Sequence, residues 1–226
     1  LFVTLGANPN NILMCDSKGV IYKGREGLNK QKEEFAVETD CRTLDDTFDG
    51  ADVFIGLSIG NDVSKDMILK MNENPIIFAM ANPDPEISPK DAFEARQDII
   101  MATGRTDYPN QVNNVLGFPF IFRGALDVAA TDINEEMKVA ASIALAKLAK
   151  LGAGPEIAKK HNRNELVYGK EYIVPSPFDP RVLVWESYAV AKAAIETGVA
   201  RINLDLNEYK SRLEKMAGVE PQDIDL

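Results

Sequence analysis

Residues 75–86 read Pro-Ile-Ile-Phe-Ala-Met-Ala-Asn-Pro-Asp-Pro-Glu, an apolar run that ends in a polar turn. The pattern recurs at residues 98–117, where Ile-Ile-Met-Ala is followed by a loop rich in Asn, Asp, Gly and Pro. Short apolar runs without alternation are typical of parallel strands buried on both faces. In open α/β sheets, ligands bind at the carboxyl ends of such strands. The two loops therefore predict a small-molecule site.

Further apolar runs lie upstream, at residues 11–16 and 52–58. Helix-start signals stand between the runs, because Ser64 precedes one helical segment and Ser88 precedes Pro89 at the start of another. Strand and helix alternating at these lengths indicate βαβ units and a parallel sheet. The expected fold class is α/β, with a Rossmann-like doubly wound parallel sheet.

Beyond residue 115 the pattern becomes mostly helical. Apolar residues recur at helical spacing from Ile133 to Leu151, and Asp132 with Glu135 forms the pattern of a capping pair. The chain starts at Leu1, and residues 1–6 resemble a helix end at its glycine cap. We therefore expect a sheet truncated at its N-terminus and followed by a helical extension. Further helices are expected at residues 156–161, 180–198 and 204–217.

Composition excludes several function classes. The 226 residues carry a net charge of −10 and no basic run, which argues against nucleic-acid and anionic membrane partners. No apolar run reaches the roughly 18 residues of a membrane span. Cys15 and Cys41 form no CxxC pattern, as expected of reduced thiols in a cytoplasmic protein. Since His161 is the single histidine, a histidine-based triad or metal site has no basis in the sequence.

The run at residues 11–16 ends in an acid. In dinucleotide-binding folds an acid at Asp16 would accept hydrogen bonds from ribose hydroxyls, although an ordinary strand-end turn has the same pattern. Lys32 belongs to a group of cations after this run, which suits either the 2′-phosphate of NADP or a solvated surface. The acid favours NAD and the cations favour NADP, so both remain open. The cations are Lys18, Lys23, Arg25 and Lys32.

Four polar side chains are candidates for ligand contacts. Ser58 follows an apolar run, among small residues that let a ligand approach the backbone. Asn82 and the pair Asn113–Asn114 carry amides, each offering two donors and an acceptor. The structural alternatives are an Asn-Pro turn and a helix cap, for which one of the two adjacent amides suffices. No residue is a candidate acid, base or nucleophile, and no carboxylate cluster has metal-ligand spacing.

Several segments closely resemble the nucleotide-binding domain of bacterial-type malic enzyme, over roughly residues 5–215. The resemblance implies oxidative decarboxylation of (S)-malate to pyruvate and carbon dioxide, with NAD or NADP and a divalent cation, Mg²⁺ or Mn²⁺. It implies a truncated NAD(P)-binding domain at residues 1–178 and a helical extension at 179–226 that packs on a catalytic domain. The matching segments are residues 11–21, 82–86, 103–127, 131–138, 177–181 and 198–201.

The resemblance also implies residue roles. Asn82 and Asn114, with Asn113 the less favoured of the pair, would contact malate and the nicotinamide end of the cofactor. Asp16 would bind the ribose and Lys32 the phosphate of NADP. Ser58 is predicted to bind the cofactor from its position after the apolar run, independently of the resemblance.

The family's catalytic Lys and Tyr, its carboxylate metal ligands and its glycine-rich loop have no counterpart here and are expected upstream. No catalytic or metal-binding residue is therefore assigned, and the 226-residue polypeptide alone is expected to be inactive. The implied partners are malate and pyruvate, in a homodimer or higher homo-oligomer that includes the catalytic domain. Two alternatives remain: a non-catalytic dinucleotide-binding or regulatory module, and another NAD-linked dehydrogenase.

Overall fold

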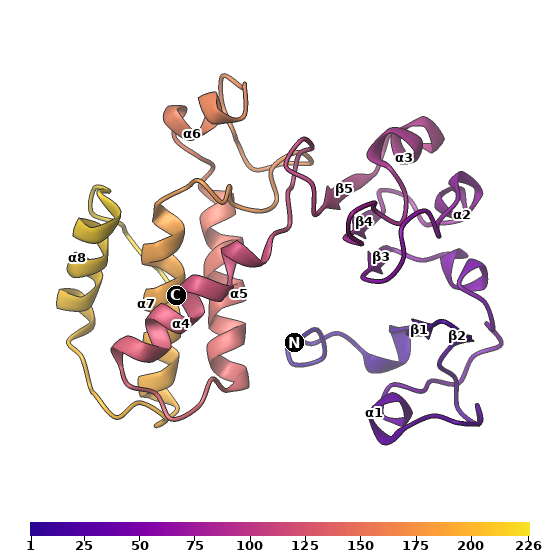
Figure 1. The fold of residues 1–226 in the computed structure, drawn as a ribbon, viewed down its shortest axis with the longest axis horizontal. Coiled ribbons are helices and arrows are strands. Elements are labelled where there is room, and N and C mark those ends of the chain that lie inside the picture. Colours follow the sequence, from indigo (N-terminus) through magenta and orange to yellow (C-terminus); the bar gives the residue numbers. More distant parts are fainter. The chain divides into compact units, whose positions relative to one another are not determined.

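The computed structural model describes all 226 residues, which form two compact units, residues 1–103 and 104–226 (Figure 1). Unit 1 contains every strand of the chain and three short α-helices. Unit 2 contains five helices, of which the four longer ones, α4, α5, α7 and α8, enclose its core. The strand-rich and helix-rich parts follow one another along the chain, as the sequence patterns predict.

Unit 1 is built on a three-stranded parallel sheet. Its strands β3 (Val53–Gly56), β4 (Ile76–Ala79) and β5 (Ile100–Thr103) lie in that order. The last residues of β3 and β4 pair, as do those of β4 and β5. Because the strands end level, the polar loops that follow them begin at one edge of the sheet. The Rossmann-like parallel sheet predicted from the apolar runs is confirmed in this part of the chain.

Two helices of unit 1 begin where the sequence predicts. The hydroxyl of Ser64 accepts a hydrogen bond from Met67 N at the start of α2 (Lys65–Leu69). The hydroxyl of Ser88 does the same for Asp91 N at the start of α3 (Pro89–Ala95). Local capping signals were therefore sufficient here. Unit 1 also contains α1 (Lys30–Glu33) and the 3₁₀ turns η1 (Pro9–Asn11) and η2 (Asp45–Phe48).

The prediction of a buried parallel strand at residues 11–16 is wrong. Only β1 (Cys15–Asp16) forms a strand there, and it pairs antiparallel with β2 (Gly19–Val20) in a separate hairpin. Gly19 adopts a φ of 99°, which reverses the chain and brings β2 alongside β1. The backbone of Arg42 lies against β2, where its carbonyl accepts a hydrogen bond from Val20 N at 2.9 Å.

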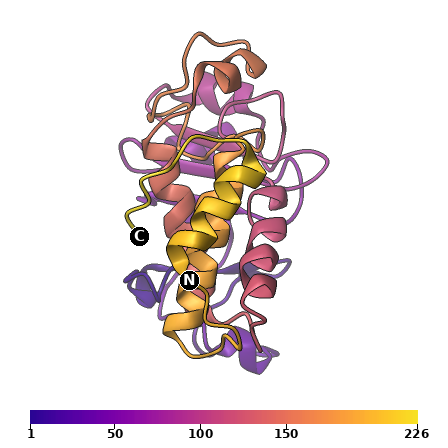
Figure 2. The same ribbon diagram turned by 90° about the vertical axis from the view of Figure 1, so that its left-hand side faces the viewer.

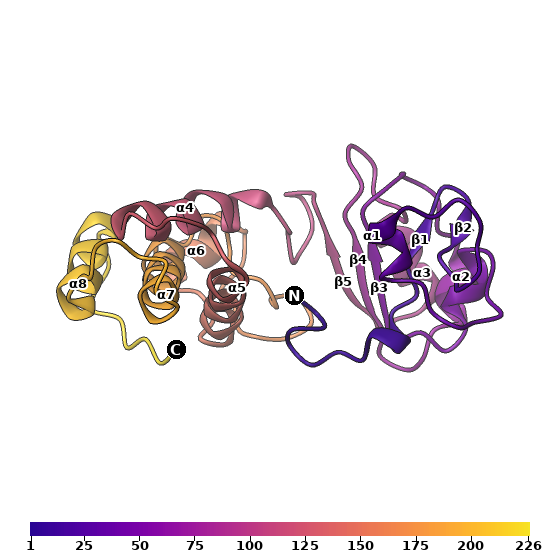
Figure 3. The ribbon, with the colours of Figure 1, turned by 90° about the horizontal axis from the view of Figure 1, so that it is seen from below.

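Unit 2 is organised around α7 (Arg181–Glu196), whose buried side chains are mostly apolar. α4 (Phe118–Asp127), α5 (Glu135–Lys150) and α8 (Leu206–Ala217) all pack on it. Figure 2 shows α8 lying along α7, and Figure 3 shows α4 running across one side of it. A β-carbon on Gly124 would lie 2.6 Å from the carbonyl oxygen of Ser187, so α4 and α7 approach more closely than a side chain there would allow.

The sequence predicted two boundaries in unit 2, the start of α5 and the domain limit at residue 178. The cap of α5 is Asn134, whose side chain accepts a hydrogen bond from Met137 N at 3.0 Å, so the Asp132–Glu135 capping pair is wrong. The core of unit 2 contains helices on both sides of residue 178, and the domain limit at that residue stays a prediction. α6 (Pro155–Lys160) completes the unit.

None of the helices has the length and apolarity needed to cross a bilayer.

Candidate functional site

A buried glutamate joins the loops that follow β3 and β4. Glu86 is only 1% exposed, and its two carboxyl oxygens accept hydrogen bonds from Ser58 N and Ala81 N, both at 3.0 Å. Its backbone carbonyl also accepts a hydrogen bond from Val63 N at 3.0 Å. Because one side chain binds the backbone of both loops, each loop holds the other in place. Sequence reasoning missed Glu86.

Two glycines make this loop arrangement possible. A β-carbon on Gly56 would overlap the carboxyl group of Glu86. A β-carbon on Gly60 would lie 2.6 Å from the carbonyl oxygen of Asp84, which is closer than real contacts allow. The glycines therefore serve the contact between the two loops. The small residues after β3, which suggested close approach by a ligand, allow close approach by the neighbouring loop.

Asn82 and Ser58 lie on these loops with their side chains exposed. The Asn82–Pro83 peptide bond is cis. Neither the Asn82 amide nor the Ser58 hydroxyl makes a hydrogen bond within the chain, whereas their backbone neighbours are held by Glu86. The backbone beside each polar group is therefore held, while the group itself is exposed and available to a ligand.

In unit 2 the adjacent amides of Asn113 and Asn114 have different roles. The side-chain oxygen of Asn113 accepts a hydrogen bond from Val115 N at 3.0 Å and caps the 3₁₀ turn η3 (Asn114–Leu116). The Asn114 side chain is exposed and makes no hydrogen bond within the chain. One amide of the pair is therefore structural, and the other is available to a ligand.

The loop that leads to this pair is anchored by Asn110. This residue is buried, and its φ is 55°. Its amide nitrogen donates to the carbonyl of Lys170 at 2.7 Å, and its oxygen accepts from Ile173 N at 2.8 Å. Arg105 and Asp107 earlier in the loop form an exposed ion pair at 2.8 Å. The anchor at Asn110 thus restrains the backbone three residues before Asn113.

The carboxylate of Asp16 is surrounded by donors. Arg25 binds one oxygen at 2.7 Å and Lys32 binds the other at 2.5 Å, while Lys18 donates only its backbone N–H, at 2.9 Å. The hydrogen bonds from Lys32 and Arg25 hold the pKa of Asp16 well below its usual range. Two cations on one acid leave a net positive charge of one at the end of β1. Lys23, also considered from sequence, makes no such contact.

The two cations are held differently. The guanidinium of Arg25 also donates to the carbonyls of Gly19 and Val20, at 3.1 and 2.8 Å, and its side chain is 10% exposed. Lys32 binds only Asp16, and its side chain is 39% exposed. Arg25 is therefore fixed to the hairpin, whereas Lys32 is free to turn toward another anion.

The resemblance implies two cofactors, a dinucleotide and a divalent cation, and the residues of this chain fit the dinucleotide but not the cation. The Asp16 cluster combines an acceptor with cationic donors, as a ribose and its phosphate require. The chain contains no group of three or more His, Cys, Asp or Glu side chains that could together hold a metal ion. His161 instead contacts the buried hydroxyl of Ser176 at 2.8 Å. No metal-dependent step is therefore assigned to residues of this chain.

Comparison with protein families and curated proteins gives consistent matches. Residues 4–155 match the family described as "Malic enzyme, NAD binding domain". A probable NADP-dependent malic enzyme of Rickettsia prowazekii is 55% identical over 215 residues, which are 94% of this chain and 28% of that protein. An NADP-dependent malic enzyme of Rhizobium meliloti is 57% identical, with the same two coverages. The chain thus spans under a third of the length of these two relatives.

Solved structures agree with the sequence matches. A malic enzyme from Pyrococcus horikoshii superposes with a TM-score of 0.80 at 32% identity, over 96% of this chain and 49% of that one. An Entamoeba histolytica malic enzyme gives a TM-score of 0.79 at 38% identity, over 95% and 44%. The fold of this chain is therefore found within about half of each of these two structures.

Proposed function

Because the chain belongs to the malic enzyme NAD-binding domain family, we propose that it is the cofactor-binding part of an enzyme that oxidatively decarboxylates (S)-malate to pyruvate and carbon dioxide. The observation that carries the proposal is the pair of exposed amides, Asn82 and Asn114, which have no partner within the chain. Each stands next to backbone held by a neighbour, Glu86 or Asn113. The malic enzyme names of the relatives favour this function over a regulatory module or another dehydrogenase.

The amides supply binding and orientation. An asparagine can donate two N–H groups to a carboxylate of malate and can accept a hydrogen bond from its hydroxyl or from a carboxamide. Since the backbone beside each amide is held, less conformational freedom is lost on binding than from a mobile loop, which lowers the entropy cost of binding. A bound nicotinamide dinucleotide supplies the hydride acceptor for the reaction. Ser58, whose backbone N–H is bound by Glu86, offers a further hydroxyl for contact with the cofactor.

We further propose that NADP is preferred over NAD. Arg25 neutralises Asp16 while bound to two carbonyls, so Lys32 can leave Asp16 for a 2′-phosphate without stranding the acid. The two relatives above are named as a probable NADP-dependent and an NADP-dependent malic enzyme, whereas an NAD-dependent malic enzyme of Rhizobium meliloti is 48% identical. The preference for NADP can be measured as the ratio of kcat/KM for the two cofactors. In Lys32→Gln this ratio should fall about tenfold, because the variant loses one charged contact to the 2′-phosphate.

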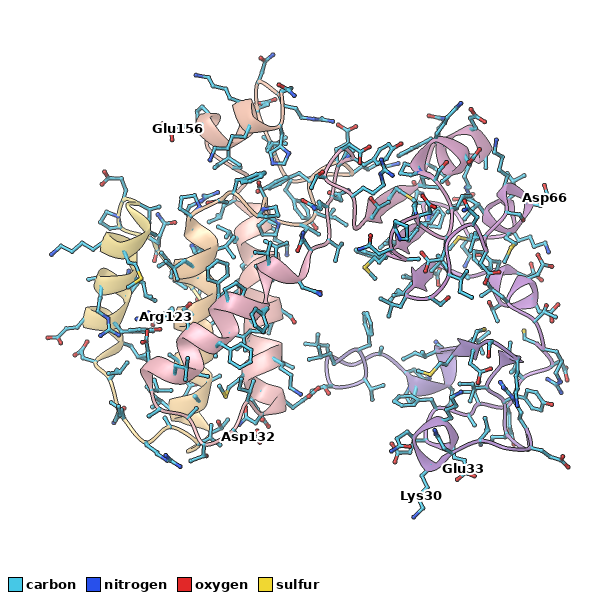
Figure 4. The ribbon with its side chains drawn as sticks, viewed as in Figure 1. Lys30, Glu33, Asp66, Arg123, Asp132 and Glu156 are labelled. Carbon is cyan, nitrogen blue, oxygen red and sulfur yellow. The ribbon has the colours of Figure 1, made fainter.

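Lys30 provides the matched control for that experiment. It lies on the same short helix, is exposed, and points away from the rest of unit 1 (Figure 4). Lys30→Gln removes the same charge from α1 and should leave the cofactor preference unchanged. An equal loss of NADP preference in both variants would mean that the overall charge of α1, and not a contact by Lys32, sets the preference.

The proposed roles of the amides are tested in the full-length protein with malate, Mn²⁺ and NADP. Asn82→Ala and Asn114→Ala should each raise the KM for malate about tenfold or more, the effect of losing an oriented hydrogen bond. Their thermal midpoints should match wild type, because neither side chain has a partner to lose. Asn164→Ala, at another exposed asparagine of unit 2, is the control. Wild-type kinetics in both variants would refute the proposed site.

Location and assembly are further parts of the proposal. We expect the enzyme to act in the cytoplasm as a homodimer or higher homo-oligomer that includes the catalytic domain. Light scattering of the purified full-length protein measures the assembly, and a monomer that turns over malate normally would contradict it. Fractionation of the source cells tests the location.

A further inference from the structure

Glu186 is a buried acid without a partner. It lies in the middle of α7, it is fully buried, and neither of its carboxyl oxygens has a hydrogen-bond partner. Burial alone raises the pKa of Glu186 to about 9, so the group is protonated at neutral pH. Glu86 in unit 1 is equally buried but binds two N–H groups. The two buried glutamates are therefore in opposite situations.

The carboxyl group of Glu186 faces the junction between η3 and α4. A β-carbon on Gly117 would lie 3.8 Å from Glu186 Oε1, which places the acid in contact distance of this glycine. Gly117 N in turn donates to the carbonyl of Asn114 at 3.1 Å. Glu186 thus lies directly behind the turn that carries the Asn114 amide.

The first turn of α4 lacks the cap that helices normally have. Its N-cap is Gly117, which has no side chain to accept a hydrogen bond, and no other side chain caps it. The first N–H groups of a helix have no partner within the helix and need an acceptor from elsewhere. The carboxyl group held against Gly117 makes no direct hydrogen bond to these N–H groups, so it can serve as their acceptor through one water molecule.

Packing alone does not explain an acid at this position. The neighbouring buried side chains of α7 include Val182, Val184 and Val190, and an apolar side chain would fill the same space. A buried polar group without a partner lowers stability relative to such a replacement. A buried polar group without a partner in a native structure calls for a specific explanation, such as a functional role or a bound water.

We propose that Glu186 is a positioning residue for Asn114, supporting the η3–α4 junction from behind so that the Asn114 amide is presented to malate. Through one water molecule, the carbonyl oxygen of its carboxyl group provides the acceptor that the first turn of α4 lacks. This inference rests on the proposed function, since it takes Asn114 to be a substrate-binding amide.

The test compares Glu186→Gln and Glu186→Leu in the full-length protein. Glutamine keeps a carbonyl acceptor and should hold the KM for malate near the wild-type value. Leucine removes the acceptor and should raise that KM about tenfold with a smaller change in kcat, while the thermal midpoint stays equal or rises. Higher stability together with weaker malate binding separates positioning from a general structural role. Glu186→Met serves the same purpose if the leucine variant does not fold.

Ser187→Ala is the matched control, because the neighbouring Ser187 hydroxyl donates to the carbonyl of Phe120 on α4 at 3.2 Å. It removes the neighbouring contact to the first turn of α4 while the Glu186 carboxyl group stays in place, and it should leave the KM for malate unchanged. If Glu186→Leu binds malate normally while Asn114→Ala does not, the inference on Glu186 is wrong and the proposed function stands. If Asn114→Ala also binds malate normally, the substrate role of Asn114 and the inference on Glu186 are both wrong, and normal binding by Asn82→Ala as well would refute the proposed site.

Discussion

The carboxyl group of Glu86 occupies the space beside Gly56 where any other residue would place its β-carbon. Gly56 is the last residue of β3, and Glu86 follows the loop after β4. From this position the acid binds Ser58 N and Ala81 N together. The conformation of the loop bearing Asn82 therefore depends on a glycine in a different strand.

Gly56→Ala should destabilise the protein by about 1–3 kcal/mol, because the added methyl group must displace the buried acid. Urea denaturation measures this change, and the KM for malate should rise in the same variant. Gly169→Ala is the control, since a β-carbon there meets nothing within 4 Å and φ is not in the left-handed region. Equal stability of the two variants would show that Glu86 moves aside without cost.

Glu86→Gln should lower stability by about 1–3 kcal/mol, because its NH₂ group would face one of two buried N–H donors. The loops after β3 and β4 should then exchange amide hydrogens faster, which hydrogen-exchange mass spectrometry detects. Glu94→Gln makes the same chemical change at an exposed ion pair with Lys65 and should change stability little. A wild-type exchange pattern in Glu86→Gln would contradict the role of Glu86 as a staple.

Asn113→Ala should destabilise unit 2 by about 0.5–2 kcal/mol, the usual range for a lost helix cap. Asn113→Asp keeps an acceptor oxygen and should remain close to wild type. Asn114→Ala should leave stability unchanged. Thermal unfolding of the three variants therefore separates the structural amide from the free one. The division of roles fails if the two alanine variants are equally stable.

Glu186 should give the protein a characteristic dependence of stability on pH. The folded protein keeps a proton on Glu186 up to about pH 9, whereas an unfolded glutamate releases its proton near pH 4.3. Between these values the folded state binds more protons, so the contribution of Glu186 to stability falls as pH rises. The stability of Glu186→Gln relative to wild type should therefore increase from about pH 4.3 to about pH 9 and then level off. Urea titrations at several pH values measure it, and a constant difference would mean that Glu186 is ionised when folded.

Local signals in the sequence predicted the parts of the fold that depend on neighbours in the chain. Ser64 and Ser88 cap helices three residues from the N–H groups they bind, and β3, β4 and β5 coincide with apolar runs. The strand expected at residues 11–16 failed because its pairing is set by Gly19 and by the distant Arg42. The cap of α5 failed because Asp132 and Asn134 are both good caps, and only the structure selects between them.

The candidate site divides in the same way. The exposed amides Asn82 and Asn114 stand out in the sequence because they are placed after apolar runs. Glu86 could not be found because its partner Ser58 is 28 residues away, and no pattern links an acid to a distant backbone N–H. Asn113 and Asn114 are chemically identical in sequence, and only the hydrogen bond to Val115 N distinguishes them. The hydrogen bonds that hold the loops of a site join residues far apart in the sequence, so sequence patterns do not predict them.

Asn110 is hydrogen-bonded to Lys170 and Ile173, so two segments that are 60 residues apart in the sequence form one structural unit. A loop that is transplanted from a relative would lose the hydrogen bonds of Asn110 unless the turn at residues 169–172 were transferred with it. Chimaeras of this protein should therefore be cut so that both segments come from the same parent.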